Sequence, residues 1–299
     1  MKLGVKNHRF FTCYLGIIAD KSVICRGISV KIGNREFDVV NNNYIMGILN
    51  VTPDSFSDGG RWSNIDLALK HAEDMIKDGA AIIDIGGEST RPGYIRVTEE
   101  EEINRIIPYI EKVKELGVPV SVDTYKARVA EEAVRAGAAL INDIWGFKGD
   151  ENMAGIAAKY QVPCCIMHNR KIKEKPYKNL MEDVLNDLRE SIDIGLRAGI
   201  RLENLITDPG IGFGKTLDDN LTVMKHLERL HELKCPILLG ASRKSMIGLT
   251  LDLPIEERVE GTIAATVIGI LKDCAFIRVH DVRENFRALK MTQAVKAAG

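Results

Sequence analysis

The sequence lacks the features that mark two large classes of protein. No apolar run in its 299 residues approaches the ~18 residues of a membrane-spanning helix, so no membrane partner is expected. Its 41 basic and 42 acidic residues give a formal net charge of −1, whereas nucleic-acid-binding domains usually carry a strong basic excess. A nucleic-acid partner is therefore not expected either.

Metal-binding patterns of cysteine and histidine are also missing. The six cysteines show no Cys-x-x-Cys spacing and the six histidines are scattered, so a zinc site is not expected. Cysteines in or beside predicted strands should be buried, reduced thiols, which favours a cytoplasmic location. These cysteines are Cys164, Cys165, Cys235 and Cys274.

What is present is the composition of a soluble globular protein, with 45% hydrophobic and 28% charged residues. The start of the chain has basic residues and an apolar patch. Asp20 and Lys21 interrupt the patch and no clear cleavage site follows, so a packed strand is expected rather than a signal peptide. Residues 1–22 are predicted to be an N-terminal extension of unknown role, and residues 23–299 a single domain.

Short apolar segments recur along the chain, and each ends in polar or glycine residues. Continuous apolar runs of this length are typical of strands buried on both faces. Because helical patterns separate them, the sheet should be parallel, and eight strand–helix repeats predict a (β/α)8 TIM barrel. The predicted strands cover residues 44–50, 81–87, 118–123, 139–143, 163–168, 204–208, 236–242 and 275–280.

Turn and capping signals organise the rest of the chain. Residues 23–40 predict an N-terminal β-hairpin that could close the N-terminal mouth of the barrel. The pairs Ser63/Asp66 and Thr98/Glu101 form capping boxes that predict two helix starts. These helices end at Gly79 and Gly117, and further helices are expected over residues 126–136, 150–160, 180–198, 218–233, 255–271 and 281–297.

The carboxyl ends of the strands of a TIM barrel converge on one face, where active sites lie. Polar side chains end most of the predicted strands, so the chain is expected to be an enzyme with one pocket on this face. The side chains that should ring the pocket are Asn50, Asp123, Asn142, His168, Asp208, Ser242 and His280.

Three connections are longer than a helix start requires: residues 51–62, 89–97 and 169–179. Such loops in a compact domain usually form lids or binding elements. Asn50, just before the first loop, offers an amide oxygen, and Asp54 and Asp58 within it offer carboxylates. This composition suits Mg²⁺ and equally suits a plain turn. The third is strongly basic and is expected to be solvated surface rather than an anion site.

Residues 50–60 (NVTPDSFSDGG) resemble the opening signature of the dihydropteroate synthases. Further matching motifs follow in order at the predicted strand ends: residues 84–93 (DIGGESTRPG), 121–124 (SVDT), 141–143 (IND), 208–215 (DPGIGFGK), 240–246 (GASRKSM) and 278–281 (RVHD). Any one of these could arise by chance, but seven in order could hardly do so.

The resemblance implies a function. This family of transferases condenses 6-hydroxymethyl-7,8-dihydropterin pyrophosphate with 4-aminobenzoate. The reaction releases pyrophosphate and gives 7,8-dihydropteroate for folate synthesis. The resemblance also implies a Mg²⁺ cofactor, sulfonamide inhibitors and a homodimer.

The pterin is expected to contact Asp123, Asn142, Asp208, Lys244 and Met167. Its edge carries N–H donors beside a carbonyl, so buried carboxylates can accept from it and an asparagine can both donate and accept. Three of these residues also have a structural alternative: helix capping for Asp123, an Asp-Pro turn for Asp208 and strand core for Met167.

The diphosphate is expected to contact Asn50, Arg91, Arg278 and His280, with Mg²⁺ on Asn50. Arg278 and His280 lie two apart on one strand, so their side chains should share a face. The resemblance makes Lys244, Arg278 and His280 the catalytic residues.

The 4-aminobenzoate should lie in a slot formed from several loops. The glycines around Phe213 are expected to let that ring fold inward, since residues 212–215 lack the spacing of a Walker loop. The resemblance assigns this slot to Thr90, Arg91, Pro92, Phe56, Phe213 and Ser245.

Other functions compete with this one. A pterin-dependent methyltransferase would use the same pterin edge but not the loops at Asn50 and Arg91. A non-catalytic pterin-binding protein would not need the diphosphate residues. An aldolase forming a Schiff base on Lys244 would need a neighbour that lowers the pKa of that lysine, and the sequence shows no obvious one.

Overall fold

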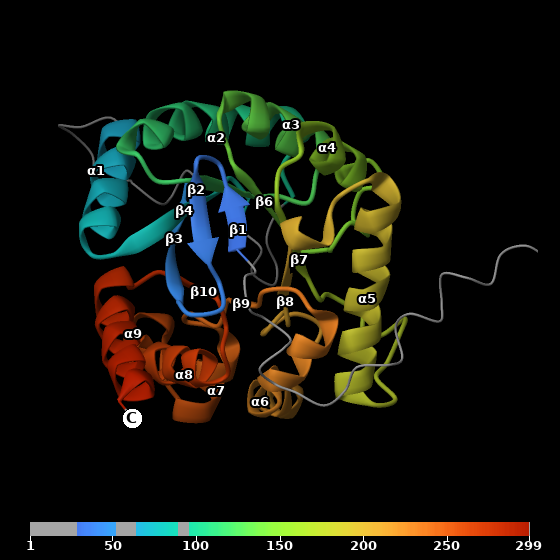
Figure 1. The fold of residues 1–299 in the computed structure, drawn as a ribbon, viewed down its shortest axis with the longest axis vertical. Coiled ribbons are helices and arrows are strands. Elements are labelled where there is room, and N and C mark those ends of the chain that lie inside the picture. Colours follow the sequence, from blue (N-terminus) through green and yellow to red (C-terminus); the bar gives the residue numbers. More distant parts are fainter. Residues whose placement is uncertain (1–28, 52–63, 89–95, 299) are drawn as a thin grey trace, which may run out of the picture.

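The computed structural model describes residues 29–51, 64–88 and 96–298. Within them, eight parallel strands form a barrel and helices surround it (Figure 1). The expected (β/α)8 TIM barrel is confirmed. Its strands are β3 (Tyr44–Asn50), β4 (Ala80–Gly86), β5 (Val120–Asp123), β6 (Leu140–Asp143), β7 (Cys164–Met167), β8 (Leu205–Asp208), β9 (Leu238–Leu239) and β10 (Phe276–Val279).

The strand order shows how the barrel closes. Neighbouring strands pair in the order β8-β7-β6-β5-β4-β3-β10-β9. A single parallel bridge from Thr207 to Ile237 joins the two ends, next to the short strand β9. The first and last strands of the barrel, β3 and β10, are direct neighbours, so residues far apart in the sequence meet in the barrel interior.

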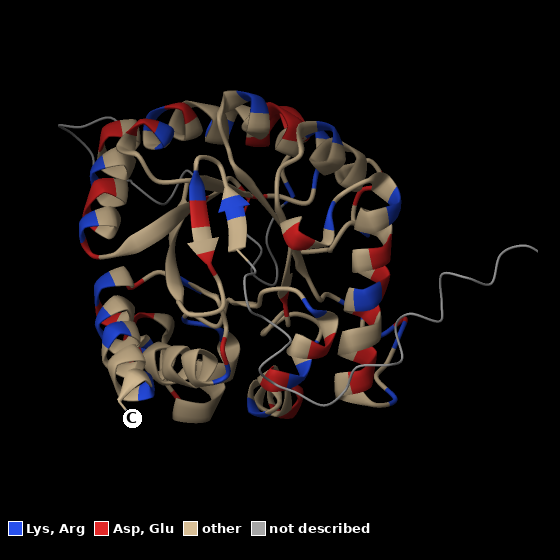
Figure 2. Ribbon diagram, viewed as in Figure 1, with Lys and Arg blue, Asp and Glu red and all other residues tan. Residues whose placement is uncertain are grey.

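The outer ring of helices follows the expected pattern. Basic and acidic residues are interspersed along its helices (Figure 2). No helix in the described ranges is both long and apolar enough to cross a membrane. The α-helices are α1 (Asn64–Lys77), α2 (Glu99–Val113), α3 (Ala127–Ala136), α4 (Met153–Tyr160), α5 (Leu180–Ala198), α6 (Leu217–Lys225), α7 (Ser245–Leu251), α8 (Val259–Leu271) and α9 (Val282–Ala297).

One of the two predicted capping boxes forms only in part. The Thr98 hydroxyl caps α2 by accepting the Glu101 N–H at 3.2 Å. The Glu101 carboxylate pairs with Arg105 one turn later, so it does not return to the Thr98 backbone. The partner residue Ser63 of the other predicted box lies outside the described residues. A complete box occurs instead at Thr216 and Asp219, ahead of α6.

The prediction of one helix over residues 218–233 is wrong. Helix α6 ends at Lys225, and a 3₁₀ helix covers Leu227–Leu233. Leu227, Leu230 and Leu233 are all buried. A spacing of three matches the three residues per turn of a 3₁₀ helix, which keeps all three leucines on the same face. A second 3₁₀ turn, Ile255–Glu257, likewise replaces the expected start of α8.

The hairpin closes one end of the barrel. Strands β1 (Ser29–Ile32) and β2 (Arg35–Asp38) pair antiparallel and lie across the ring of strands in Figure 1. Val30, Ile32 and Phe37 are fully buried and pack in a cluster with interior strand residues such as Met46 and Phe276. The expected role of the hairpin is therefore confirmed. Residues 1–28, which include the predicted extension and the start of the predicted hairpin, are outside the described ranges.

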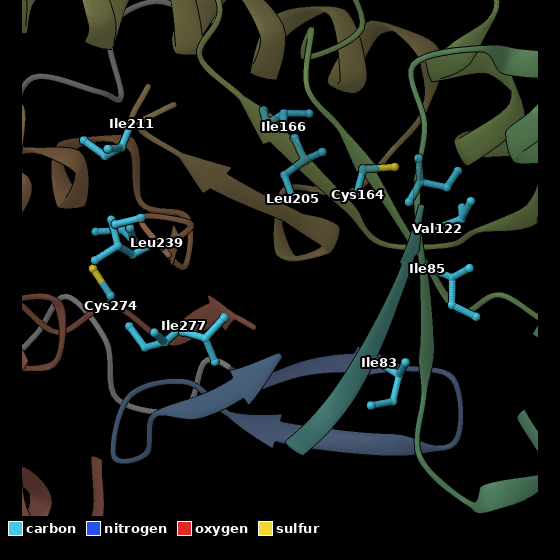
Figure 3. Close-up of a cluster of buried hydrophobic side chains, with 14 of the residues drawn as sticks. Ile83, Ile85, Val122, Cys164, Ile166, Leu205, Ile211, Leu239, Cys274 and Ile277 are labelled. Carbon is cyan, nitrogen blue, oxygen red and sulfur yellow. The ribbon is translucent and has the colours of Figure 1, made fainter. Parts of the chain in front are cut away.

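A second apolar cluster lies between the barrel and its helices. Figure 3 shows side chains from several strands in it, among them Ile83, Ile85 and Val122. Because successive strand residues face opposite sides, Ile82 and Asp84 face the barrel interior while Ile83 and Ile85 face the helices. The four cysteines predicted to be buried thiols, Cys164, Cys165, Cys235 and Cys274, are all buried and free.

Candidate active site

The barrel interior changes from apolar to polar toward the carboxyl ends of the strands. Residues of the apolar cluster under the hairpin, such as Ile82, Leu140 and Phe276, are followed two positions later by Asp84, Asn142 and Arg278. A separation of two keeps a side chain on the same face of a strand. By the same alternation, the inward positions at this level are Asp84, Asp123, Asn142, Met167, Asp208, Gly240 and Arg278, all of them polar or small except Met167.

Arg278 connects three strands of this layer. Its Nε donates to Asp84 Oδ2 at 2.6 Å, and its Nη2 donates to Asp123 Oδ2 at 2.6 Å. Asn142 Nδ2 donates to Asp84 Oδ2 at 3.2 Å. Burial by itself lowers the pKa of Arg278, but the two carboxylates outweigh it and raise that pKa, so the guanidinium stays charged. Arg278, expected at the diphosphate, thus binds a carboxylate expected at the pterin.

Three oxygens of this cluster have no partner within the described part of the chain. Asp84 Oδ1, Ser121 Oγ and Asp123 Oδ1 are buried and make no hydrogen bond. A buried acceptor without a donor costs about 1–3 kcal/mol, so natural proteins leave few of them. Oxygens left open together in a barrel interior are suited to accept N–H groups from a ligand.

Burial also makes Asp123 hard to ionise. It raises the pKa of Asp123 to about 7; Arg278 opposes the shift and the neighbouring Asp84 adds to it. A bound ligand that donates an N–H would favour the charged form. The helix-capping alternative for Asp123 is wrong, because the N-cap of α3 is Lys126 and the Thr124 hydroxyl accepts its N–H.

Asp208 and Lys244 face each other across Gly240. Asp208 Oδ1 accepts the Gly210 N–H at 2.6 Å, so the Asp-Pro turn does form. A Cβ atom on Gly240 would lie 3.4 Å from Asp208 Oδ2 and 3.8 Å from Lys244 Nζ. Any side chain at residue 240 would therefore fill the space between the carboxylate and the ammonium group.

The charges of this pair are shifted by burial. Burial raises the pKa of Asp208, and Lys244 opposes that shift. Burial lowers the pKa of Lys244 to about 8, although the carboxylates of Asp208 and Asp123 oppose it. Lys244 Nζ also lies 4.7 Å from the centre of the Phe213 ring, a cation–π distance. Ser245 follows as the exposed first residue of α7.

Two further expected residues lie at strand ends. Met167 is 4% exposed and is in register with Asp208 on the neighbouring strand. Its neighbour Cys165, two positions earlier, belongs to the interior cluster, which puts Met167 on the inner face as well.

His280 and Asn50 lie at the same end of the barrel. The Ser242 hydroxyl accepts the His280 backbone N–H at 3.2 Å and lies 2.9 Å from His280 Nδ1. That hydroxyl can donate to Nδ1, which leaves the Nε2 proton of the ring as a donor. Asn50 is exposed at the end of β3. A Cβ atom placed on Gly86 would lie within 4 Å of both Asn50 Oδ1 and Asp123 Oδ2, so these two oxygens lie on the same side of β4.

The structure thus brings together Asn50, Asp123, Asn142, Met167, Asp208, Lys244, Phe213 and Arg278, with Ser245 and His280 on adjoining strand and helix ends. The remaining expected residues, Phe56, Thr90, Arg91 and Pro92, lie outside the described residues.

Sequence reasoning missed two members of the cluster. Asp84 is fully buried and binds Arg278, and Ser121 carries one of the unpartnered oxygens. The sequence held a signal for Asp84, since a charged residue inside the apolar run Ala81-Ile-Ile-Asp-Ile needs a partner in the fold. For Ser121 the signal is weaker: it lies two residues before Asp123 and so shares its face.

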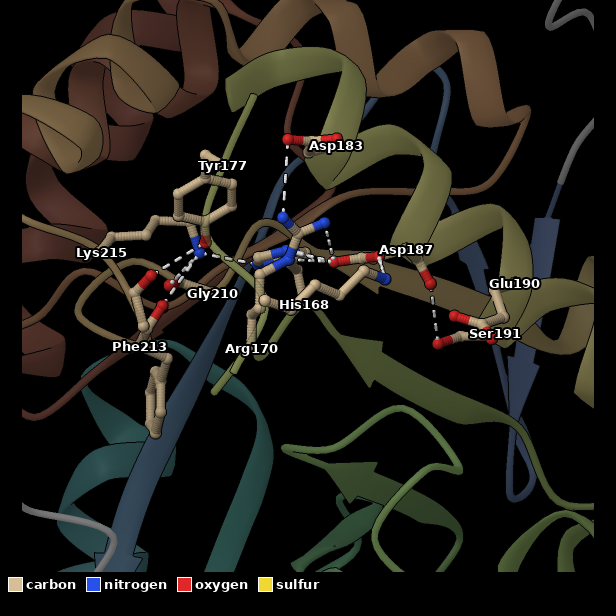
Figure 4. A network of polar contacts seen from close by, with 12 residues as sticks. His168, Arg170, Tyr177, Asp183, Asp187, Glu190, Ser191, Gly210, Phe213 and Lys215 are labelled. Carbon is tan, nitrogen blue, oxygen red and sulfur yellow. Dashed lines mark hydrogen bonds and ion pairs between the residues drawn. The ribbon is translucent and has the colours of Figure 1, made fainter. Parts of the chain in front are cut away.

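One other expectation is wrong. His168 does not ring the pocket: its ring contacts Asp187 of α5 and Lys215 (Figure 4). The basic segment after it is exposed over residues 171–176, as expected, and Arg170 is the exception, since it is 6% exposed and also binds Asp187. Both side chains join a buried polar network beside the pocket.

Comparisons with known proteins identify the family of this chain. Residues 46–280 match the family described as pterin binding enzyme. A dihydropteroate synthase of Clostridium beijerinckii is 65% identical over 268 residues, which cover 89% of this chain and 99% of that protein.

Solved structures show the same likeness. The dihydropteroate synthase of Clostridium difficile in the presence of pteroic acid is 49% identical, with a TM-score of 0.84, over 88% of this chain and 100% of that one. The Yersinia pestis enzyme in a sulfonamide drug complex is 42% identical, with a TM-score of 0.84, over 90% of this chain and 100% of that one.

The fold and the polar layer inside the barrel define a pterin-binding barrel enzyme, and the chain belongs to the pterin binding enzyme family. Within that family it belongs with the dihydropteroate synthases, which condense 6-hydroxymethyl-7,8-dihydropterin pyrophosphate with 4-aminobenzoate in folate biosynthesis.

Proposed function

We propose that Asp123, Asn142, Asp208, Lys244 and Met167 bind the pterin of this reaction. The unpartnered buried oxygens of Asp84, Ser121 and Asp123 carry the proposal, because the N–H groups of a pterin edge would satisfy acceptors of this kind. Lys244 donates to the carbonyl side of the ring. Arg278 binds one oxygen of each of the two carboxyl groups, which leaves the other oxygen of each for the ligand.

The 4-aminobenzoate lies against Phe213 in this proposal. The Lys244 ammonium stacked on that ring and the exposed Ser245 hydroxyl next to it support a slot for an aryl group with a carboxylate. From the sequence motifs, Thr90, Arg91, Pro92 and Phe56 complete the slot. Sulfonamides, which the Yersinia pestis relative binds, would then compete with 4-aminobenzoate here.

Asn50, Arg91, Arg278 and His280 bind the diphosphate, and Mg²⁺ binds with it. In the described ranges no group of three or more His, Cys, Asp or Glu side chains could hold a metal. Asn50 offers one amide oxygen. That donor set fits Mg²⁺, which commonly takes one or two protein oxygens and completes its shell with substrate phosphates and water. When bound, the ion would neutralise charge on the leaving diphosphate.

The chemistry is transfer of the pterinylmethyl group, which makes the enzyme an alkyl/aryl transferase. None of the assigned residues is an obvious base for the aryl amine, whereas cationic and N–H donors gather where the diphosphate leaves. We therefore propose that C–O cleavage precedes attack by the amine, with Asp123 and Asp208 offsetting positive charge on the pterin. Electrostatic stabilisation of the leaving group is worth about 3–4 kcal/mol per donor in such sites.

Two experiments test the activity and its mechanism. Incubation with the pterin pyrophosphate, 4-aminobenzoate and Mg²⁺ should yield dihydropteroate, and no product from folded protein would refute the assignment. Substrate labelled at the bridging oxygen, given without the amine, should scramble the label into non-bridging positions. Absence of scrambling, with a strong dependence of the chemical step on amine nucleophilicity, would favour direct displacement.

We also propose a homodimer formed through helices α7, α8 and α9. These neighbouring helices carry large apolar side chains that are strongly exposed: Leu249, Leu251, Ile268, Leu271, Met291 and Val295. Exposed large apolar side chains gathered on neighbouring helices support a protein interface there. Sedimentation analysis should give twice the chain mass, and Leu249→Glu with Met291→Glu should yield monomers.

The cellular site and domain organisation complete the proposal. We assign the protein to the cytoplasm, supported by the free, buried state of the four described cysteines. Residues 23–299 act as one pterin-binding domain, preceded by an extension over residues 1–22.

A further inference from the structure

Beside the pocket, a glycine-rich loop carries Phe213 from β8 to α6. Three of its glycines adopt left-handed backbone conformations, with φ of +68° at Gly210, +83° at Gly212 and +55° at Gly214. A Cβ atom on Gly210 would lie 1.9 Å from the His168 carbonyl oxygen, and one on Gly214 would lie 2.3 Å from that of Arg170. The loop therefore lies directly against the backbone that follows β7.

Lys215 ties this loop down from within. Its Nζ donates to the carbonyl oxygens of Gly210 at 2.9 Å and Phe213 at 3.1 Å, and it lies 2.8 Å from His168 Nδ1 (Figure 4). Burial lowers the pKa of Lys215 to about 7, and in the ammonium form its three donors match these three acceptors. Both ends of the segment Gly210–Phe213 are thus bound to one side chain.

The acceptor role of His168 depends on a second contact. His168 Nε2 lies 3.2 Å from Asp187 Oδ2, and the carboxylate there requires the ring to carry its proton on Nε2. Nδ1 is then free to accept from Lys215. Burial lowers the pKa of His168 to about 4, which keeps the ring neutral and this arrangement intact at neutral pH.

The loop in turn contacts two pocket groups. The Phe213 ring lies under Lys244 Nζ at 4.7 Å. A Cβ atom on Gly212 would lie 3.2 Å from Lys244 Cδ, so the loop backbone also packs against the stem of that lysine. Movement of this segment would carry the Phe213 ring with it, whereas the Lys244 backbone is held separately as the N-cap of α7.

We propose that Lys215 is a positioning residue for the 4-aminobenzoate slot, acting through Asp187, His168 and the Gly210–Phe213 backbone to fix Phe213 against Lys244. This rests on the proposed assignment of Phe213 to that slot. Lys215 itself touches no substrate. Loss of the Lys215 side chain should therefore weaken binding of 4-aminobenzoate and leave binding of the pterin unchanged. The pterin residue Asp208 keeps its own hydrogen bond from the Gly210 N–H and its place at the end of β8.

The test variant is Lys215→Met, which keeps the aliphatic stem and removes the three donors. Lys148→Met is the matched control: Lys148 Nζ also donates to this network, to the Asp187 carbonyl oxygen at 2.8 Å, but no contact joins it to the loop. Three quantities are measured for each folded variant: KM for 4-aminobenzoate, pterin affinity by calorimetry, and hydrogen exchange of the peptide covering residues 209–217.

We expect Lys215→Met to raise KM for 4-aminobenzoate at least about tenfold, because small displacements at a substrate-positioning group are costly. Exchange in the loop peptide should accelerate, while pterin affinity stays the same. Lys148→Met should change none of the three. Unchanged loop exchange in Lys215→Met would overturn the proposal, and so would an equal loss of pterin affinity, which would show that Lys215 acts on Asp208 instead.

A double variant separates this proposal from the slot assignment on which it rests. If Lys215 acts through Phe213, then Lys215→Met should add nothing to the KM of Phe213→Leu. Fully additive effects would overturn the proposed route through Phe213. An unchanged KM in Phe213→Leu alone would refute the assignment of Phe213 to the slot, while the loop-exchange result would still report on the anchoring by Lys215.

Discussion

Two buried polar clusters lie side by side at the carboxyl ends of the strands, and their carboxylates behave in opposite ways. Asp187 accepts from His168, from Arg170 at 2.7 Å and from Lys175 at 2.7 Å. Burial alone raises the pKa of Asp187, but these donors outweigh it and hold that pKa well below its usual range. Asp123 has one charged donor and one open oxygen, and its pKa is raised.

This difference distinguishes a polar cluster that stabilises the fold from a polar cluster that can bind a ligand. The Asp187 cluster satisfies its carboxylate within the protein, so it stabilises one arrangement of the chain. The Asp123 cluster keeps three buried oxygens open, which is unfavourable in the free protein and becomes favourable when a ligand supplies N–H donors. Substitutions of Asp187 and of the arginine that it binds should therefore affect stability, and substitutions in the second cluster should affect binding and catalysis.

The largest effect is expected for Asp187→Asn. Removing one partner of a buried charge network leaves the Arg170 guanidinium, 4% exposed, without its main counter-charge, which typically costs roughly 3–5 kcal/mol. Urea denaturation should show this loss, with little change in pterin affinity of the folded variant. A small stability change combined with weak pterin binding would abolish the distinction between the two clusters.

Arg278→Met should reduce catalysis most among the pocket variants. It removes a cation from the proposed diphosphate site, for which we expect a fall in kcat/KM of about 10²–10³-fold. Arg170→Met, which also removes a buried arginine, serves as the control. In this variant the loss of unfolding free energy should exceed the loss of transition-state stabilisation calculated from kcat/KM. The comparison fails if both variants lose activity and stability in the same proportion.

The stability of the protein should fall as the pH drops from 6.5 to 4. In this window an unfolded His168, with its usual pKa of 6.5, binds a proton, whereas the folded ring, with a pKa of about 4, does not. The unfolded state therefore gains protons, and the full shift is worth roughly 3 kcal/mol. Denaturation at several pH values should show that the free energy of unfolding of His168→Gln falls less steeply with decreasing pH than that of the unsubstituted protein. Equal slopes in the two proteins would show that His168 is not responsible.

The smallest effect is expected for Asp123→Asn, which keeps the shape but removes the anionic acceptor. Pterin binding should weaken by about 1–3 kcal/mol. In the unsubstituted protein the affinity should rise as the pH increases through about 7, since the carboxylate is the better acceptor and its pKa lies there. Calorimetry should show no such rise in the variant. Unchanged affinity in folded Asp123→Asn would remove this residue from the site.

Much of the architecture could be predicted from local patterns. Apolar runs, helix caps and turn residues predict the strands and most helices, because each depends on neighbours in the sequence. The polar residues that end the strands follow from the same alternation, so Asp123, Asn142 and Asp208 were found in advance. Asp84 could have been found too, since an isolated charge inside an apolar strand requires a partner.

Local patterns in the chain are therefore enough to predict the barrel, the hairpin that closes it and the strand ends where the site lies. Which polar side chains meet depends on the three-dimensional arrangement of the strands. Arg278 reaches Asp84 and Asp123, 194 and 155 residues away, because β10 is the neighbour of β3. His168 turns from the pocket because Asp187 and Lys215 each satisfy one nitrogen of its buried ring. The physical reason is that local propensity depends on adjacent residues, whereas the pairing of buried charges depends on distances that barrel closure alone creates.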